Sequence, residues 1–258
     1  MSRFDHIGDA PPVAPVDQRG PATRGCEDFL ADGDRHLRRG RFEAALRAYG
    51  KALEEDRTRT EPWLGQVRAL IEMAQPGEAL TWIEQASRVV GESPRLLALW
   101  AIAAARAGHL DDAIAWSDRA MRQGMDDADV WLARAEVLYL NRQARLAPTV
   151  LDKAHERAPG AETARRCGEV ALAAADLPTA RGWLERAVRA APDDPLVALR
   201  FGVYWHAAGF VERARTELDR ALALEPTLAP ARLARDSLDN LNFFGRLRAR
   251  LRRTFHGT

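Results

Sequence analysis

The sequence is poor in cysteine and in aromatic residues. Its 258 residues include 2 cysteines, and aromatic residues make up 7% of the chain. Cys26 and Cys167 lie far apart and form no CxxC pair, so neither a disulfide framework nor a zinc site is indicated. Alanine, leucine and arginine dominate instead, and these residues lose little side-chain freedom in a helix. The composition therefore favours an all-α fold.

The chain also lacks an excess of charge of either sign. It has 38 basic and 37 acidic residues, so no global field draws it to nucleic acid or to an anionic membrane. Only Lys51 and Lys153 among the basic residues are lysines. The arginine content has two interpretations, an arginine-rich binding surface or the codon usage of a GC-rich bacterial genome. The even spread of the arginines favours the second.

Known catalytic motifs are missing as well. The sequence has no G-x-x-x-x-G-K-[ST], no G-x-S-x-G and no HExxH. We therefore expect no enzyme activity, cofactor, metal or small-molecule substrate, and no nucleic-acid partner. The first residues lack the pattern of a signal peptide, and no run of about 18 apolar residues could span a membrane. The expected location is the cytoplasm, with peripheral membrane contact as an addition that depends on the C-terminal tail.

A repeat of 34 residues organises what is present. Similar segments recur around six alanines, and the spacing between successive ones is 34 residues with a single exception of 33. A fixed period of this length is the signature of a solenoid. The alanines are Ala45, Ala79, Ala113, Ala147, Ala180 and Ala214.

The period divides the chain into six units, 26–59, 60–93, 94–127, 128–160, 161–194 and 195–228. Each unit resembles the tetratricopeptide repeat family. The family's bulky residue at position 4 is matched by Trp63 and Trp131, and its closing proline by Pro159, Pro192 and Pro226. The glycine at position 8 is matched by Gly33, Gly168 and Gly202. Arg57, Gly91 and Met125 replace the proline in the first three units, and we expect those units to join less rigidly.

The resemblance implies an all-α, right-handed superhelical solenoid of six helix pairs. Residues 1–25, rich in Pro and Gly, are expected to be a disordered arm. Residues 229–241 are expected to form a capping helix, with Leu233, Leu238 and Leu241 facing the solenoid, followed by a basic amphipathic tail over 242–258. Pro148 falls just inside a second helix, so that helix should start late or kink.

In this family the first helix of each pair lines a concave groove that binds peptides. The matching positions predict an apolar floor with arginines concentrated from the third unit onward, which suits a protein or peptide partner with acidic and apolar residues. The alternative is that these positions are ordinary solvated helix faces. The candidate groove residues are Arg68, Arg95, Leu99, Ile102, Arg106, Leu132, Tyr139, Arg165, Arg166 and Arg200.

The C-terminal tail shows an apolar stripe flanked by arginines, a pattern typical of an interfacial helix. It could meet a membrane surface, dock on a protein, or fold back on the solenoid. The residues proposed for docking are Phe243, Phe244, Arg246, Leu247, Arg250 and Leu251. The leading hypothesis is thus a non-catalytic scaffold or adaptor that holds a partner peptide or helix. The alternative is a membrane-surface accessory protein recruited by this tail.

Overall fold

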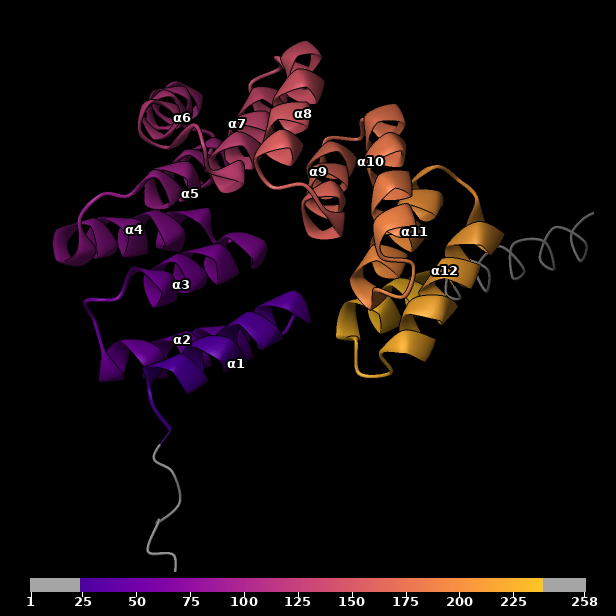
Figure 1. The fold of residues 1–258 in the computed structure, drawn as a ribbon, viewed down its shortest axis with the longest axis horizontal. Coiled ribbons are helices and arrows are strands. Elements are labelled where there is room, and N and C mark those ends of the chain that lie inside the picture. The colour runs from indigo at the N-terminus through magenta and orange to yellow at the C-terminus, as the bar shows by residue number, and fades with distance from the viewer. Residues whose placement is uncertain (1–23, 239–258) are drawn as a thin grey trace, which may run out of the picture.

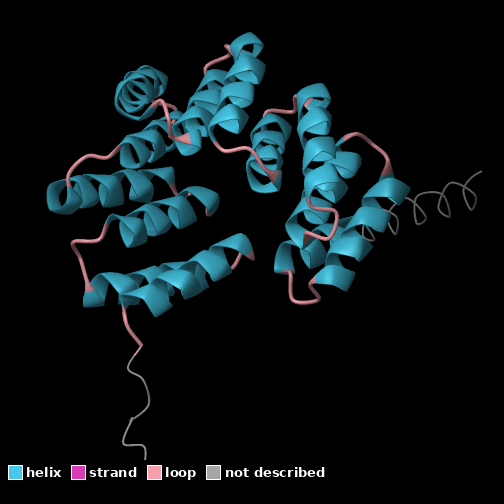
Figure 2. Cartoon of the chain, in the orientation of Figure 1, coloured by secondary structure: helices cyan, strands magenta, loops and turns pink. Residues whose placement is uncertain are grey.

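The computed structural model describes residues 24–238, and their regular structure is entirely helical (Figures 1 and 2). This confirms the all-α solenoid. The helices are α1 (Cys26–Arg38), α2 (Phe42–Glu55), α3 (Thr60–Glu72), α4 (Pro76–Val90), α5 (Pro94–Arg106), α6 (Leu110–Gly124), α7 (Ala128–Leu140), η1 (Ala144–Leu146), α8 (Ala147–Arg157), α9 (Ala161–Ala173), α10 (Leu177–Ala190), α11 (Pro195–Ala207) and α12 (Val211–Leu224). Residues 229–238 form a further helix.

The helix pairs follow one another along a curve (Figure 1). In each unit the first helix packs on the second, and each second helix packs on the first helix of the next unit. Successive first helices also contact each other, from α1 with α3 through to α9 with α11, whereas the second helices make no comparable contacts with one another in residues 24–238. The first helices must therefore lie on the shorter, inner side of the curve. We call their surface that faces away from the second helices the inner wall.

The core between helices is built from small residues at two fixed positions of the second helices. Each of these alanines has at most 1% of its surface exposed, so the paired helices approach closely without a cavity. Large side chains fill the remaining space. The alanines are Ala45, Ala79, Ala113, Ala147, Ala180 and Ala214 at the first position, and Ala52, Ala86, Ala120, Ala154, Ala187 and Ala221 at the second.

The ring of Tyr49 shows how closely the helices approach. It lies between Gly33 on α1 and Gly65 on α3, and a Cβ atom added at either glycine would stand 2.4 Å from the ring. The Tyr49 hydroxyl donates a hydrogen bond of 2.8 Å to Asp34. Burial and the neighbouring Asp34 carboxylate raise the pKa of Tyr49. This tyrosine therefore fixes the spacing of the first two units.

The turn inside every helix pair contains one residue with positive φ. Three of these residues are glycines and three carry side chains, and the 34-residue period runs through all of them. A side chain in this left-handed region costs about 1 kcal/mol or more. The residues, with φ between 57° and 88°, are Gly40, Ala74, Gly108, Arg142, Ala175 and Gly209.

The fourth unit differs from the others, as Pro148 predicted. A short 3-10 turn, Ala144–Leu146, precedes α8, which begins only at Ala147 and has 11 residues. The second helix of the preceding unit, α6, has 15 residues. A proline in the first turn of a helix loses no hydrogen bond there, so the chain starts α8 at this point. The expectation of a late start is confirmed.

Two of the three linkers that lack the closing proline are held by indole groups. Trp63 donates from Nε1 to the Arg57 carbonyl at 2.9 Å, and Trp131 donates to the Met125 carbonyl at 2.7 Å. These carbonyls belong to the residues that replace the proline. The lower rigidity of these junctions stays a prediction, but each of these two linkers has a specific anchor.

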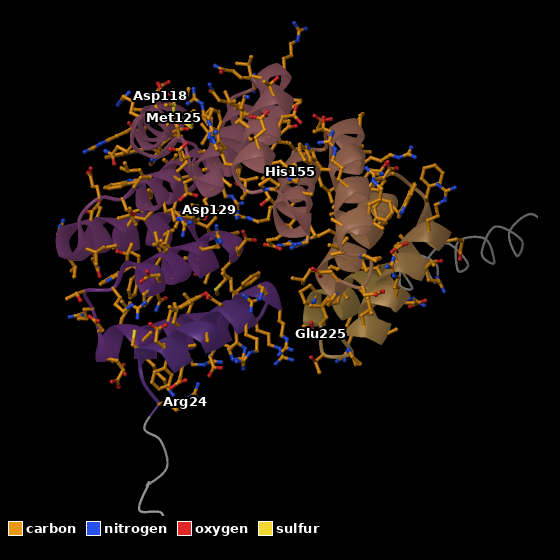
Figure 3. All side chains as sticks on the ribbon, viewed as in Figure 1. Arg24, Asp118, Met125, Asp129, His155 and Glu225 are labelled. Carbon is orange, nitrogen blue, oxygen red and sulfur yellow. The ribbon has the colours of Figure 1, made fainter. Side chains whose placement is uncertain are left out.

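The two ends of the solenoid contact each other. Arg39, beside the first turn, forms an ion pair with Glu225 after α12, and Arg41 donates to the Thr227 carbonyl at 3.3 Å. Gly40 packs so closely on Pro230 that an added Cβ atom would stand 2.4 Å from the proline ring. Glu225 is labelled near this junction in Figure 3. The contact between the ends closes the curve of the described chain.

The C-terminal helix over 229–238 covers the last unit, with Leu238 facing the solenoid as expected and Leu233 facing away from it. Ala231 and Leu238 are buried, whereas Leu233 is 70% exposed. The expectation that Leu233 faces the solenoid is therefore wrong, because the helix turns its alanines toward α12 and places Arg235 2.6 Å from Asp219. The expected disordered arm (apart from 24 and 25), the last residues of the capping helix, Leu241 among them, and the whole tail lie outside the described residues.

Candidate functional site

The inner wall carries groups of charged side chains that come from several helices. Its largest group centres on Asp129 in the first turn of α7, which lies on the inner side of the curve in Figure 3. Arg166 from α9 donates a hydrogen bond to the Asp129 carboxylate. Arg95 from α5 and Arg68 from α3 approach the same carboxylate at 3.6 and 3.8 Å. Three helices from other units thus send a guanidinium toward one aspartate.

The charged groups around Asp129 shift one another's pKa values. Burial by itself raises the pKa of Asp129, but Arg166 and Arg68 outweigh burial and hold this pKa below its usual range. Enclosure by the surrounding wall and the neighbouring Arg166 lower the pKa of Arg68, although 40% of its side chain is exposed and solvent screens this effect. We call Arg68, Arg95, Asp127, Asp129 and Arg166 the Asp129 cluster. Asp127 belongs to it because its carboxylate accepts a 2.6 Å hydrogen bond from Arg95 and caps α7 through the Asp129 backbone N–H at 2.9 Å.

A cleft of about 630 Å³ opens beside the Asp129 cluster. It is lined by the α6 to α7 linker, the end of α8 and the first half of α9. Arg95 and Arg166 face this cleft, and so do Asp127 and Asp129. Arg157 also lines the cleft and donates to the Met125 carbonyl at 3.0 Å. The cleft gives a ligand access to the Asp129 cluster.

A second group of charges centres on Glu169 in α9. Arg165 and Arg200 both donate to the Glu169 carboxylate, and Arg165 also bonds Glu162 at 2.6 Å. Burial raises the pKa of Glu169, but Arg200 and Arg165 outweigh burial and lower it. The Arg165 side chain is only 8% exposed. Two guanidiniums face two carboxylates here, so this group is balanced within the chain.

A third pair joins α5 to α7. Arg106 donates to Glu136 at 2.7 Å and to the Ile71 carbonyl at 3.0 Å. Glu72 lies beside this pair, at the end of α3. Enclosure by the surrounding wall and the nearby Glu136 and Glu169 raise the pKa of Glu72, against the effect of Arg106. The Glu72 side chain is nevertheless open to solvent, which screens this effect.

The apolar floor expected from the sequence is largely absent. Leu99 and Leu132 are buried at 7% and 4% exposure, so they belong to the core between helices and not to an open surface. Ile102 is half-buried. Tyr139 donates a hydrogen bond of 2.8 Å to Asp176, and burial together with that carboxylate raises its pKa. The prediction that Leu99 and Leu132 line the groove is therefore wrong, because they pack where successive first helices meet.

The expected arginines are on the wall, but they already have partners in the chain. Arg68, Arg95 and Arg166 meet at the Asp129 cluster, Arg165 and Arg200 at Glu169, and Arg106 pairs with Glu136. The sequence-based prediction omitted Asp127 and Asp129. Asp129 occupies the second position of its unit, as Arg95 does in the unit before, so the same register rule could have found it. The candidate tail residues, Phe243 to Leu251, lie outside the described part of the chain.

Other chemistry in residues 24–238 is sparse. No group of three His, Cys, Asp or Glu side chains is placed to hold a metal ion in this range. Burial raises the pKa of the Cys167 thiol to about 12, so little reactive thiolate forms at neutral pH. No helix among these residues is long and apolar enough to cross a membrane.

Comparison with known proteins supports the repeat assignment. Residues 36–101 match the model of the tetratricopeptide repeat family. No curated protein matches the chain.

Solved structures show the fold. The yeast Tom70 structure superposes with a TM-score of 0.55 at 15% identity, covering 86% of this chain and 50% of that one. A tetratricopeptide repeat protein from Parabacteroides merdae gives 0.52 at 13% identity, covering 80% and 84%. A chain of the APC/C Cut9–Hcn1 hetero-tetramer gives 0.51 at 16% identity, covering 83% and 43%. This chain thus spans about half the length of the first and less than half of the last.

Proposed function

Since this chain is a tetratricopeptide repeat protein, we propose that it is a non-catalytic scaffold or adaptor that binds a peptide or helix of a partner protein along its inner wall. Solenoids of this kind create extended concave surfaces, and such surfaces take up peptide segments. One of the similar folds belongs to a hetero-tetramer, Cut9–Hcn1, so protein assembly has a parallel among these structures. The proposed setting is the cytoplasm.

The observation that supports the proposal is the concentration of charge on the inner wall. A stacked solenoid needs apolar contacts between helices, but its stacking does not require six arginines from four helices to gather on one surface. These arginines come from α3, α5, α9 and α11 and meet carboxylates at the N-cap of α7, on α7 and on α9. Arginines and carboxylates that are partly solvated can exchange an internal partner for an external one at small cost.

The partner that fits this wall carries polar and acidic groups together with a smaller apolar part than the sequence implied. Leu99 and Leu132 are in the core, which leaves Ile102 as the half-buried apolar contribution from the candidate residues. Charge recognition must then supply most of the specificity.

Charge reversal on the inner wall tests this proposal. The full chain with Arg68→Glu and Arg95→Glu should recover its partners about tenfold less well than the wild type, because two cations near the cleft become anions. Arg122→Glu with Arg145→Glu is the matched control, since both residues are exposed on the outer elements α6 and η1. Equal recovery by the two double variants, with the same melting temperature, would refute an inner-wall site.

The sequence of the tail supports a second candidate, recruitment to a membrane surface. Its stripe of Phe243, Leu247 and Leu251 with flanking arginines has the pattern of an interfacial helix. Flotation of the full chain with anionic vesicles at low salt, compared with a form ending at Leu241, tests it. Failure of the full chain to float, or equal flotation of both forms, removes this candidate.

A further inference from the structure

The two ends of the solenoid are joined by contacts that the stacking of repeats does not require. Each unit of a solenoid contacts its neighbours along the chain. Here the turn between α1 and α2 also meets the segment that follows α12, so the curve of helices closes on itself (Figure 1). The three contacts are the ion pair of Arg39 with Glu225, the hydrogen bond of Arg41 to the Thr227 carbonyl, and the packing of Gly40 on Pro230.

The closed curve leaves little room in front of the inner wall. Arg68 of the second unit lies 3.8 Å from the Asp129 carboxylate of the fourth unit, and Arg166 of the fifth unit donates to the same carboxylate. An α-helix with its side chains is about 10 Å wide. A partner helix therefore cannot lie between these groups. Because the second and fourth units are not adjacent, the space between them depends on the curvature that the joined ends hold fixed.

The contacts between the ends are of a kind that can open and close. The side chains of Arg39 and Glu225 are 34% and 19% exposed, and ion pairs that solvent reaches contribute little stability. No apolar cluster of residues 24–238 spans the junction. Leu228 belongs to the core of the last three units, and Tyr49 to that of the first two. The ends can therefore separate without exposing the core of any unit.

We propose that the contact between the two ends is a latch that controls access to the inner wall. While the latch is closed, the curvature is fixed and large groups are kept out. When it opens, the solenoid relaxes its curvature and the inner wall becomes accessible. This inference rests on the proposed function, since it assigns a regulation to the same surface. A partner that binds the open form better than the closed form shifts the chain toward the open form.

An engineered disulfide tests whether the ends meet. A Cβ atom added at Gly40 would lie 3.8 Å from the Pro230 Cβ atom, and disulfides join Cβ atoms about 3.8 Å apart. Gly40→Cys with Pro230→Cys, in a chain with Cys26→Ser, should therefore oxidise to an intramolecular disulfide, seen on a non-reducing gel. The turn accepts a side chain, since Arg142 has a φ of 59° at the same position of the fourth unit. Gly108→Cys with Pro230→Cys is the matched control, because nothing lies within 4 Å of a Cβ atom at Gly108.

The reactivity of a cysteine on the inner wall tests whether the latch controls access. Glu72→Cys, again with Cys26→Ser, is treated with N-ethylmaleimide or with a maleimide that carries a large polyethylene glycol chain. The rate of the large reagent relative to the small one measures the exclusion of bulky groups. Glu225→Arg sets two cations against each other at the latch, and it should raise this relative rate about fivefold or more.

Rebuilding the ion pair separates the latch from a local effect of the substitution. Arg39→Glu with Glu225→Arg should return the relative rate close to that of the unchanged latch, because the pair forms again with reversed polarity. A cysteine on the outer helix α6, Arg122→Cys, should keep the same relative rate in every latch variant. Should Glu225→Arg fail to fold, Arg39→Glu alone breaks the pair from its other side.

Three results would overturn the inference. They are equal oxidation of the two cysteine pairs, a relative rate at Glu72→Cys that does not change when the ion pair is broken, or a raised rate that persists when the pair is rebuilt. None of these measurements uses a partner protein. The proposed function stands or falls with the capture experiment on charge-reversed variants, so the two ideas can fail separately.

Discussion

Each first helix has a packing side, which contacts the second helices, and a side on the inner wall. The residues on these two sides follow different sequence patterns. On the packing side, Gly33 and Gly65 meet Tyr49, while Gly168 meets Leu184 and Gly202 meets Leu218 on their paired second helices. On the inner wall the charge at one position changes from unit to unit, since the second position holds Arg95 in the third unit and Asp129 in the fourth. The packing side keeps its period, and the inner wall does not.

This difference shows where specificity lies in the molecule. Every unit must present the same shape to its neighbour, because a solenoid is stabilised by contacts between adjacent repeats. Residues on the inner wall carry no such constraint, so their charges can serve a partner. Arg165 is the exception, since it lies on an inner-wall helix but is buried like a core residue.

Replacing Arg165 is the most stringent test of the comparison between the packing side and the inner wall. Arg165→Glu should destabilise the fold by about 3 kcal/mol or more, because it places a third carboxylate beside Glu162 and Glu169 and leaves them without their shared cation. Chemical denaturation measures the loss. The exposed pair of Arg181 and Glu185 is the control, and Arg181→Glu should change the unfolding midpoint far less. Similar losses in both variants would show that Arg165 is an ordinary surface residue.

The packing side should respond to a single methyl group. Gly65→Ala places a Cβ atom 2.4 Å from the Tyr49 ring, and we expect it to cost about 2 kcal/mol through overpacking. Gly182→Ala is the matched control in α10, where nothing lies within 4 Å of the added atom. There the better helix propensity of alanine should stabilise the protein by about 0.5 kcal/mol or more. Thermal unfolding of both variants gives the contrast, and equal signs would contradict it.

The inner wall should instead respond to pH. Asp129→Asn should cost about 1.5 kcal/mol at pH 7, because it removes the charged partner of Arg166. Since the pKa of Asp129 is lowered in the fold, its stabilisation is complete above the unfolded value of about 3.9 and is lost as pH falls through the folded value. Denaturation at pH 7 and at decreasing acidic pH should show the wild type and the variant converging.

Glu72, on the same wall, should give folding stability the opposite dependence on pH. Its pKa is raised, so the stability linked to its proton is complete below about 4.3 and is lost as pH rises through the folded value. Glu72→Gln should therefore raise the melting temperature slightly at pH 7, and this gain should vanish at low pH. A loss of stability with Glu72→Gln at pH 7 would contradict the assignment.

The turns should respond to the exchange of alanine and glycine. Ala74→Gly should stabilise the protein by about 1 kcal/mol, because φ is 57° at Ala74 and glycine adopts this region without strain. Gly108→Ala, at the same position one unit later, should destabilise by a similar amount. Melting temperatures of the two variants test the periodic turn. Destabilisation by Ala74→Gly would mean that the alanine methyl group contributes more by packing than it costs in strain.

The sequence predicted the periodic part of the molecule well and the aperiodic part poorly. The six alanines of the second helices are buried at intervals of 34 residues, with one of 33, because close helix packing imposes the same small residue in each unit. The late start of α8 followed from Pro148 for an equally local reason.

The inner wall depends on contacts that the repeat pattern does not encode. Leu99 and Leu132 were expected on an open floor, but their burial is set by how closely successive first helices pack. The pairing of Arg166 with Asp129 joins residues 37 positions apart. The contact between Arg39 and Glu225 depends on the accumulated curvature of six units. Neither the pairing of Arg166 with Asp129 nor the contact of Arg39 with Glu225 can be predicted from the sequence of a single repeat.

Site-specific photo-crosslinking tests the central claim, binding on the inner wall, most directly. A p-benzoylphenylalanine side chain replaces Glu72, which is exposed on the inner wall, or Arg122, which is exposed on the outer helix α6. After irradiation with its partners, the full chain should form covalent adducts from position 72, and peptide mapping should find an acidic segment at the linkage. Position 122 should give few adducts. Adducts formed equally from both positions, or only from position 122, would contradict a partner site on the inner wall.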